Sequence, residues 1–384
     1  MAGAEDPTAG HRVHGMGLAL EAPIWPAITP DEAAVVLAHF PDAAPIEALR
    51  WHSPRPFSAA TLIDTAGGAL LLKRHDRRVR DVAGLAEEHA FIAHLAASGA
   101  SVPETLRTRE GASAVGIGEW TYELHRRAVG EDLYRDQPSW TPFRSGAHAH
   151  AAGVALARLH RASQGFDAPA RKGQPLVASF AILSATDPMA AAESYVAARP
   201  ALAAFLAGRS WRSRLASLFR ASGEGLAPLV ARQASLWTHN DWHPSNLLWA
   251  ADGTVETVFD FGLSDRSCAA HDLAIAIERS GFAWLELGER RDDAIADPAA
   301  ALSLIAGYRT TALLTHDVIE AVVRLLPLVH IEFALSEIAY FAGIVGDHDA
   351  ACLAWETYLL GHADWFLSAA GQGFLDRLRT GLNL

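Results

Sequence analysis

Two short motifs close together in the chain constrain its fold and chemistry most: the octapeptide 239–246, His-Asn-Asp-Trp-His-Pro-Ser-Asn, and the tripeptide 260–262, Asp-Phe-Gly. Transfer of a phosphoryl group requires a carboxylate that orients the acceptor hydroxyl and takes its proton. It also requires an amide oxygen and a second carboxylate that hold Mg²⁺. Asp241, Asn246 and Asp260 suit these roles in that order. The motifs therefore predict an ATP- and Mg²⁺-dependent phosphotransferase, with Asp241 catalytic and the other two as metal ligands.

The chain between the motifs predicts a β-hairpin. Residues 246–250 and 255–260 are typical of strands, and Asp252-Gly253 between them is a strong turn signal. Pairing of these strands would bring Asp260 back beside Asn246, as a shared metal site needs.

Two other interpretations of these motifs stay open. His239, Asp241 and His243 form an H-x-D-x-H pattern, and imidazole and carboxylate are ligands that suit Zn²⁺ or Fe²⁺. That interpretation gives Asn246 and Asp-Phe-Gly no role. An Asp-Phe-Gly turn by itself is common as a purely structural feature, and the combination with the octapeptide is what makes the pattern specific.

A lysine at the end of an apolar strand is the next candidate. The chain contains two lysines, Lys73 and Lys172, and uses arginine for its other permanent cations. A compact ammonium fits between phosphates where a guanidinium is too wide, so Lys73 is predicted to bind phosphate. The alternative is a strand-end lysine whose ammonium reaches out to solvent.

These features resemble the aminoglycoside phosphotransferase and choline kinase-like family, the phosphotransferase enzyme family. The resemblance is strongest to the branch with type II homoserine kinases and the bacterial stress-response kinase, and it covers residues from about 45 to 280. Besides the two motifs it rests on the segments 71–73 (Leu-Leu-Lys), 88–95 (Glu-His-Ala-Phe-Ile-Ala-His-Leu), 102–103 (Val-Pro), 154–160 (Val-Ala-Leu-Ala-Arg-Leu-His) and 271–274 (His-Asp-Leu-Ala).

The resemblance implies a protein kinase-like, two-lobed α+β fold with a small antiparallel-sheet N-lobe and a larger, mostly helical C-lobe. Lys73 would bind phosphates and pair with Glu88, and backbone groups near Arg126 and Ala128 would bind adenine. Glu88 also lies on the apolar face of its expected helix. We expect a flexible tail and N-terminal extension over 1–44, an N-lobe over 45–127, and a C-lobe over 128–384 with the catalytic loop 239–246 and the metal-binding turn 260–262.

The local patterns also predict individual elements. Leu49 and Trp51, residues 61–64 and residues 69–73 are expected to form a β-meander, and residues 104–108 a strand. Helices are expected over 189–204 and 317–342, among others.

One segment departs from the protein kinase pattern. Residues 53–60, where a phosphate-covering loop is expected, contain no glycine. Small residues at 58–60 still allow close approach of the backbone, and Arg55 would add positive charge. A proline-stiffened connector is the alternative.

Composition excludes several classes of protein. The formal charge of −12 offers no basic footprint for nucleic acid. We find no stretch of eighteen uncharged apolar residues, the length that suggests a membrane span, and no signal peptide. Two cysteines, Cys268 and Cys352, are typical of a reducing cytoplasm. The sequence says nothing of the oligomeric state.

The acceptor is predicted to be a hydroxyl on a small metabolite that is amino-acid-like, an aminoglycoside or an amino alcohol. Only nine residues separate Gly262 from Asp272, too few for a long activation loop, and Asp272 is expected to hold the catalytic loop. Asp265 beside Arg266 slightly favours a zwitterion. A Ser/Thr protein kinase of the stress-response type and a non-catalytic nucleotide-binding pseudokinase remain alternatives. Candidate acceptor contacts are Asp265, Arg266, Glu278, Arg279, His330, Glu332 and Glu337.

Overall fold

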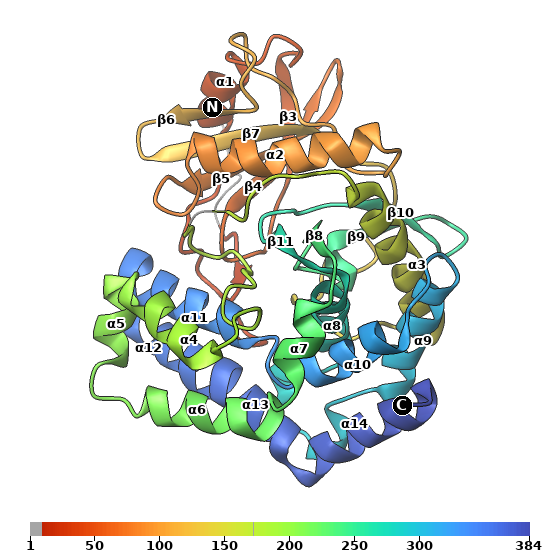
Figure 1. Cartoon of the computed structure of the whole chain (residues 1–384). Coiled ribbons are helices and arrows are strands. Elements are labelled where there is room, and N and C mark those ends of the chain that lie inside the picture. Colours follow the sequence, from red (N-terminus) through yellow and green to blue (C-terminus); the bar gives the residue numbers. More distant parts are fainter. Residues whose placement is uncertain (1–9, 172) are drawn as a thin grey trace.

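The computed structural model describes residues 10–171 and 173–384. Figure 1 shows a small lobe built around a β-sheet and a larger lobe built mostly of helices. The expected α+β, two-lobed fold is thereby confirmed. None of the helices in the described part of the chain is both long enough and apolar enough to cross a membrane.

The small lobe contains a five-stranded antiparallel sheet in the order β3-β4-β5-β7-β6. Buried and partly exposed positions alternate along β4, so one face is packed and the register is fixed. Lys73 on β5 lies opposite Glu123 on β7. The expected meander is confirmed. The strands are β3 Ile46–His52, β4 Ala59–Thr65, β5 Gly68–Asp76, β6 Ala114–Ile117 and β7 Trp120–Arg126.

Helix α2, Val82–Ala97, lies across the sheet on the side that faces the large lobe (Figure 1). Asp81 caps its N-terminus by accepting a hydrogen bond from Gly84 N. Phe91 and Leu95 point into the core, and Glu88 is buried on the same face. The sequence period therefore predicted the inward face of this helix correctly.

The N-terminal extension forms regular structure over its described part, and residues 1–9 lie outside the described residues. Strands β1, Val13–His14, and β2, Leu20–Glu21, pair antiparallel, and helix α1, Pro30–Leu37, follows. Thr29 and Glu32 form a capping box at the start of α1. The helix packs its apolar side onto the sheet in a core separate from that of the large lobe. The extension is thus part of the small lobe's packing.

The large lobe contains one continuous hydrophobic core. Helices α3 and α9 approach most closely at Gly153 and Gly307, where an added Cβ would lie 1.9 Å from a backbone oxygen of the facing helix. The helices are α3 Gly146–Ser163, α4 Pro188–Ala197, α5 Pro200–Leu206, α6 Trp211–Ser222, α7 Leu226–Ala231, α8 Ala269–Ser280, α9 Pro298–Arg309, α10 His316–Leu325, α11 Ile331–Tyr340, α12 His348–Leu353, α13 His362–Leu367 and α14 Ala369–Leu382.

The catalytic motifs lie on two small β-ribbons inside this lobe. Strands β9, Leu247–Trp249, and β10, Val255–Val258, pair antiparallel, so the expected hairpin is confirmed. Strand β8, Ser235–Thr238, pairs with β11, Asp265–Cys268. The two ribbons place the octapeptide and the Asp-Phe-Gly turn at the same end of the lobe.

Three details differ from what the sequence pattern suggests. A helix expected over 189–204 is interrupted before Pro200, which begins α5, and one expected over 317–342 is interrupted around Pro327, because a proline cannot continue the helical hydrogen bonds. A strand expected over 104–108 reduces to a single bridge between Thr105 and His125.

Candidate active site

The catalytic loop is held by one buried carboxylate. Asp272 Oδ1 accepts a hydrogen bond from Asn240 N at 2.8 Å, and Oδ2 accepts from His239 N at 3.0 Å and His160 Nε2 at 2.9 Å. These bonds fix a turn in which Asn240 has a positive φ of 59°. The expected structural role of Asp272 is confirmed.

Asp241 and Asn246 lie side by side at the end of this loop. Asn246 Nδ2 donates to Asp241 O at 2.9 Å and to Asp241 Oδ2 at 3.0 Å. Because the amide nitrogen is used in this way, the amide oxygen of Asn246 is the atom left for a cation. The pair therefore brings together a carboxylate and an amide oxygen, at the two positions where the sequence predicts the catalytic base and a metal ligand.

Asp260 faces Lys73 across the boundary between the lobes. Lys73 Nζ donates to Asp260 Oδ1 at 2.9 Å. Burial opposes the charge on Lys73, but Asp260 and then Glu123 hold the pKa of the ammonium above its ordinary value. Burial likewise opposes the charge on Asp260, and Lys73 holds the pKa of Asp260 below its ordinary value. Both groups are therefore charged at neutral pH.

Arg279, on α8, makes an ion pair with Asp241 that the motifs do not predict. Its guanidinium carbon lies 4.5 Å from the ring centre of Phe333. Burial opposes the charge on Asp241, but Arg279 and then His243 hold the pKa of Asp241 below its ordinary value. Asp241 is therefore an ionised, weakly basic carboxylate, suited to orienting a hydroxyl. Sequence reasoning named Arg279 only as an acceptor contact.

Glu88 has a different closest cation from the one expected. Among the described residues, Lys73 makes its ion pair with Asp260, whereas Glu88 lies 3.8 Å from the Arg171 guanidinium. Arg171 also donates to Gly262 O at 3.1 Å and to Gly84 O at 2.9 Å. Arg171 thus ties α2 to the Asp-Phe-Gly turn. We found no sequence signal for this arginine.

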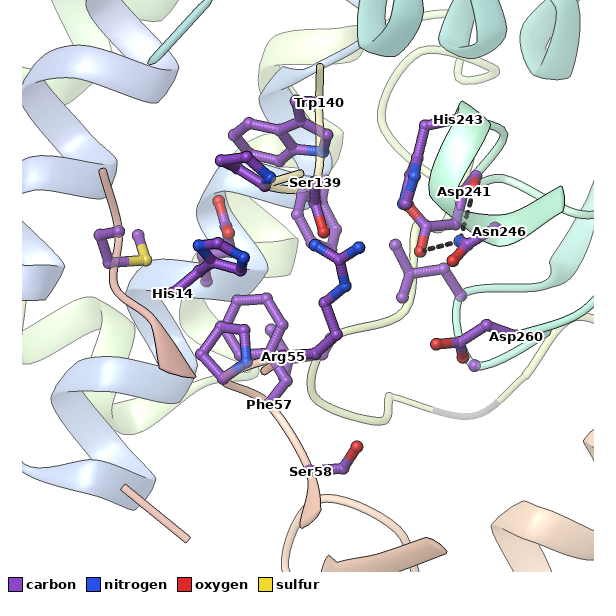
Figure 2. A pocket seen from close by; sticks show the side chains of 18 of the residues that line it. His14, Arg55, Phe57, Ser58, Ser139, Trp140, Asp241, His243, Asn246 and Asp260 are labelled. Carbon is purple, nitrogen blue, oxygen red and sulfur yellow. Dashed lines mark hydrogen bonds and ion pairs between the residues drawn. The ribbon is translucent and has the colours of Figure 1, made fainter. Parts of the chain in front are cut away.

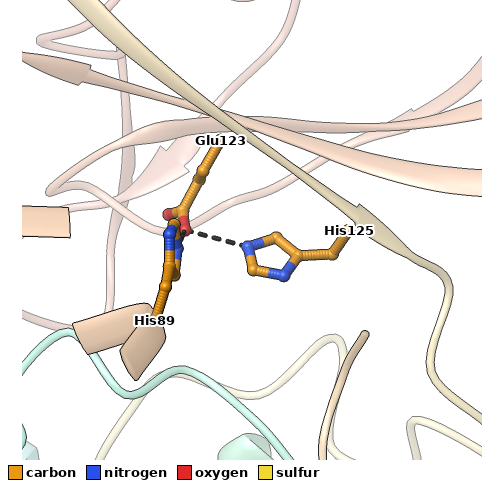
Figure 3. A group of neighbouring side chains, drawn as sticks. All are labelled: His89, Glu123 and His125. Carbon is orange, nitrogen blue, oxygen red and sulfur yellow. Dashed lines mark hydrogen bonds and ion pairs between the residues drawn. The ribbon is translucent and has the colours of Figure 1, made fainter. Parts of the chain in front are cut away.

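A buried carboxylate behind Lys73 binds three histidines. Glu123 accepts from His75 Nε2 at 2.8 Å, His89 Nε2 at 2.6 Å and His125 Nε2 at 2.8 Å, and Figure 3 shows His89 and His125 directed at it. Burial opposes its charge, but the histidines, His125 first, hold the pKa of Glu123 well below its ordinary value. Glu123 therefore adds negative charge near Lys73. The alternation along β5 and β7 places His75, Glu123 and His125 on one face of the sheet, which is the signal that the sequence offers.

Two cavities meet at the catalytic loop and the Lys73–Asp260 pair. Arg55, Lys73, Asn246 and Asp260 line both. The first cavity, of about 150 Å³, extends toward the C-terminal helices and is also lined by Asp241, Trp140, Arg279, Phe333, Glu337 and Tyr358. The second cavity, of about 170 Å³, extends beneath the sheet and is also lined by Glu88, Glu123, Arg126, Ala128 and Leu248.

The segment 53–60 contributes to both cavities despite its lack of glycine. Arg55 rises between Trp140 on one side and Asp241 and Asn246 on the other (Figure 2). Arg55 NH1 donates to Gln137 O at 2.8 Å, which holds the side chain in the cavity. The segment therefore adds a cation beside the catalytic loop.

Comparison with known proteins agrees with this geometry. A sequence profile of the phosphotransferase enzyme family matches residues 57–314. The chain belongs to the phosphotransferase enzyme family. The expected enzyme class, a phosphotransferase with an alcohol group as acceptor, is confirmed. The narrower relation to homoserine kinases and the stress-response kinase stays a prediction.

Solved structures share the fold of this phosphotransferase at low sequence identity. The microcompartment-associated aminopropanol kinase has a TM-score of 0.58 at 20% identity over 88% of this chain and 98% of its own. An aminoglycoside phosphotransferase from Alicyclobacillus acidocaldarius has a TM-score of 0.51 at 18% identity over 91% of this chain and 96% of its own. An amicoumacin kinase has a TM-score of 0.51 at 16% identity over 91% of this chain and 90% of its own. No curated protein sequence matches.

The alternative of an H-x-D-x-H metal site does not suit the geometry of this phosphotransferase. His239 Nδ1 accepts from Asp241 N at 3.1 Å, and His239 Nε2 contacts Phe259 O at 3.0 Å. Both ring nitrogens of His239 therefore serve the backbone, and neither is left as a ligand.

The candidate acceptor contacts separate into two groups. Arg279 and Glu337 line the first cavity of the phosphotransferase. Glu332 instead accepts hydrogen bonds from Ala181 N, Ile182 N and Leu183 N. Asp265 accepts from Arg171 N at 2.7 Å, so the Asp265–Arg266 argument for a zwitterion loses its basis.

Proposed function

We propose that this phosphotransferase transfers the γ-phosphoryl group of ATP, with Mg²⁺, to a hydroxyl of a small metabolite that carries an amine. The observation that carries the proposal is the meeting of Asp241, Asn246, Asp260 and Lys73 where the two cavities join. One cavity accepts the nucleotide and the other the acceptor, so the reacting groups would face each other at this point.

Each residue has a role that follows from its geometry. Asp241, fixed by Arg279 and Asn246, orients the acceptor hydroxyl and takes its proton. The Asn246 amide oxygen and the Asp260 carboxylate hold the metal, and Lys73 binds phosphate. Bound Mg²⁺ and ATP supply the transferable group and neutralise its charge.

The second cavity suits the nucleotide. Its wall includes Arg126 and Ala128, at the passage from the sheet to the large lobe. Arg126 N already donates to Glu104 O at 3.0 Å, and in the described ranges no hydrogen bond from Ala128 N is found. We assign adenine to the backbone of Arg126 and Ala128, the N-lobe to 45–127 and the C-lobe to 128–384. Glu88 would then pair with Lys73 when nucleotide replaces the present Lys73–Asp260 contact.

The first cavity favours an acceptor with a cationic group. Glu337 is buried there, and its Oε2 has no hydrogen-bond partner among the described residues. Trp140, Phe333 and Tyr358 surround it with aromatic surface, which attracts ammonium groups. The similar structures include an aminopropanol kinase and an aminoglycoside phosphotransferase, which supports an amine-bearing alcohol.

The test is ADP release by the purified protein with Mg²⁺ and ATP. The acceptors are amino alcohols, hydroxylated amino acids, choline, aminoglycosides, uncharged sugars and a generic protein, and Asp241→Asn is the matched control. We expect turnover with an amine-bearing alcohol that Asp241→Asn abolishes. Turnover with sugars alone would contradict the proposal that the acceptor carries an amine. Turnover with the generic protein would favour a protein kinase of the stress-response type. ATP binding without turnover on any acceptor would favour a non-catalytic pseudokinase.

A further inference from the structure

A third cavity lies behind the wall of the first. It has a volume of about 20 Å³ and shares Trp140, Arg279 and Glu337 with the first cavity. A volume of this size holds one water molecule or one ion. Four buried polar atoms in its lining residues have no hydrogen-bond partner among the described residues: His271 Nδ1, His330 Nδ1, His362 Nε2 and Glu337 Oε2. Such a concentration of unpaired atoms around one small space indicates a missing occupant.

His330 presents a lone pair to this space. Its Nε2 lies 3.0 Å from Leu359 O, an acceptor, so the proton is on Nε2. The unprotonated Nδ1 is buried and without a partner in the described part of the chain. A ring nitrogen that donates to a backbone carbonyl while the other is left free is the arrangement found in metal-binding histidines.

His362 meets a carboxylate at the same space. Its Nδ1 lies 3.1 Å from Glu278 Oε1, a separation that suits two ligand atoms of one ion, because neighbouring ligands of a tetrahedral Zn²⁺ lie about 3.3 Å apart. The ring stacks on Trp284 with centroids 3.9 Å apart and an angle of 15° between the planes. The imidazole is therefore held in one orientation.

We propose that Glu278, His330 and His362 bind a divalent transition-metal ion of the zinc type. One ligand atom from each of the three buried residues lies within 4.8 Å of the others. Two imidazoles and a carboxylate are a donor set that suits Zn²⁺ and leaves one position for a water or a further carboxylate. This site is separate from the proposed Mg²⁺ site and does not depend on the proposed function.

The other buried histidine cluster does not have this character. At Glu123 the Nε2 atoms of His89 and His125 each contact the carboxylate at hydrogen-bond distance, so the donors and the acceptor satisfy one another. A hydrogen-bond network accounts for that cluster, whereas beside Glu278 the Nδ1 atom of His330 has no partner among the described residues.

The ion would link helices that line the first cavity, where the acceptor is proposed to bind. Glu278 precedes Arg279 on α8, His330 lies at the start of α11 and His362 at the start of α13. Arg279 pairs with Asp241, and α11 carries Glu337. A metal joining the three helices would fix both residues without touching the reacting atoms.

The experiment uses the full chain, stripped of metal with a chelator and then titrated with Zn²⁺ by calorimetry and with Co²⁺ by visible absorption. We expect one equivalent of either ion, a Co²⁺ spectrum typical of four-coordinate nitrogen and oxygen ligands, and a higher melting temperature with Zn²⁺. Absence of stoichiometric binding by the unaltered protein overturns the proposal, because the occupant is then a water molecule. This arm does not rely on any variant being folded.

Two variants test the histidine ligands, and two more serve as controls. His330→Gln and His362→Gln keep a polar side chain and should each weaken Zn²⁺ binding by about tenfold or more. Exposed His316→Gln is the surface control and His89→Gln reports on the Glu123 cluster; neither should change the affinity. Binding that survives in His330→Gln and His362→Gln, or is lost in His89→Gln, contradicts the assignment. Melting of each metal-free variant is compared with the unaltered protein to separate loss of a ligand from loss of fold.

Discussion

Lys73 Nζ on the sheet and Asp260 Oδ1 in the large lobe lie 2.9 Å apart, so this ion pair spans the two lobes and lines both cavities. The same two groups are assigned to phosphate and metal. Bound Mg²⁺ and nucleotide would therefore replace the direct Lys73–Asp260 contact. Asp260 would contact the metal and Lys73 the phosphates, and the lobes would keep similar positions.

Replacement of Lys73 should impair the use of ATP strongly. We expect Lys73→Ala to lower kcat/KM for ATP by about 10²-fold or more, because a preorganised cation is lost from a buried site. Lys73→Arg should not restore activity, since the guanidinium is wider and more rigid. Steady-state kinetics with exposed Arg77→Ala as control would test this. Restoration by arginine would show that only the charge matters.

Replacement of Arg279 should affect turnover more than nucleotide binding. We expect Arg279→Leu to lower kcat by about 10- to 100-fold, because Asp241 loses the partner that fixes it, with ATP affinity nearly unchanged. Measurement of kcat beside nucleotide binding by calorimetry separates the two effects. Arg290→Leu, at an exposed ion pair, is the control. An unchanged kcat would mean that Asp241 is positioned by Asn246 alone.

Acceptor binding should improve as pH rises toward 8. Burial raises the pKa of Glu337 to about 8, so the side chain is neutral below that pH and carries its charge above it. A cationic acceptor binds the charged form, hence KM for the acceptor should fall as pH rises from about 6.5 to about 9.5, a range that extends more than one unit on either side of that pKa. Glu337→Gln should show a higher, flat KM over this range. A pH dependence that persists in Glu337→Gln would assign it to another group.

The same residue should reduce stability at higher pH. The folded protein keeps the Glu337 proton up to pH about 8, whereas the unfolded chain releases it near the ordinary pKa of 4.5. The folded state thus binds more protons between these values, and its free energy of unfolding falls as pH rises through this window. The slope is at most about 1.4 kcal/mol per pH unit. Denaturant unfolding of the unaltered protein and of Glu337→Gln should differ by this slope, and equal slopes would contradict the raised pKa.

Gly153 should tolerate no side chain. Gly153→Ala places a Cβ 1.9 Å from Leu304 O on α9, so we expect a loss of about 3 kcal/mol in the free energy of unfolding. Gly373→Ala, in α14 with no atom within 4 Å of the new Cβ, is a matched control. That control should gain up to about 1 kcal/mol because alanine favours the helix. Equal effects of the two substitutions would contradict the close packing of α3 and α9.

Local features of the fold were predictable because their causes are local. The turn Asp252-Gly253 and the flanking apolar residues specified the hairpin that carries Asp260, and the helical period around Phe91 placed Glu88 inward. The interruptions at Pro200 and Pro327 are also encoded locally, because a proline cannot continue the helical hydrogen bonds. The bridge at Thr105 replaced a predicted strand, since strand pairing depends on a partner that propensity does not describe.

The sequence by itself determined the chemistry of the catalytic loop, because the spacing of Asp241, Asn246 and Asp260 encodes a short turn and a hairpin. Tertiary structure alone decided what surrounds these groups. Arg279 meets Asp241 and Glu337 enters the first cavity because helices distant in sequence pack around one core. Such contacts follow from long-range packing and burial, which also set the pKa of each carboxylate, and no local pattern records them.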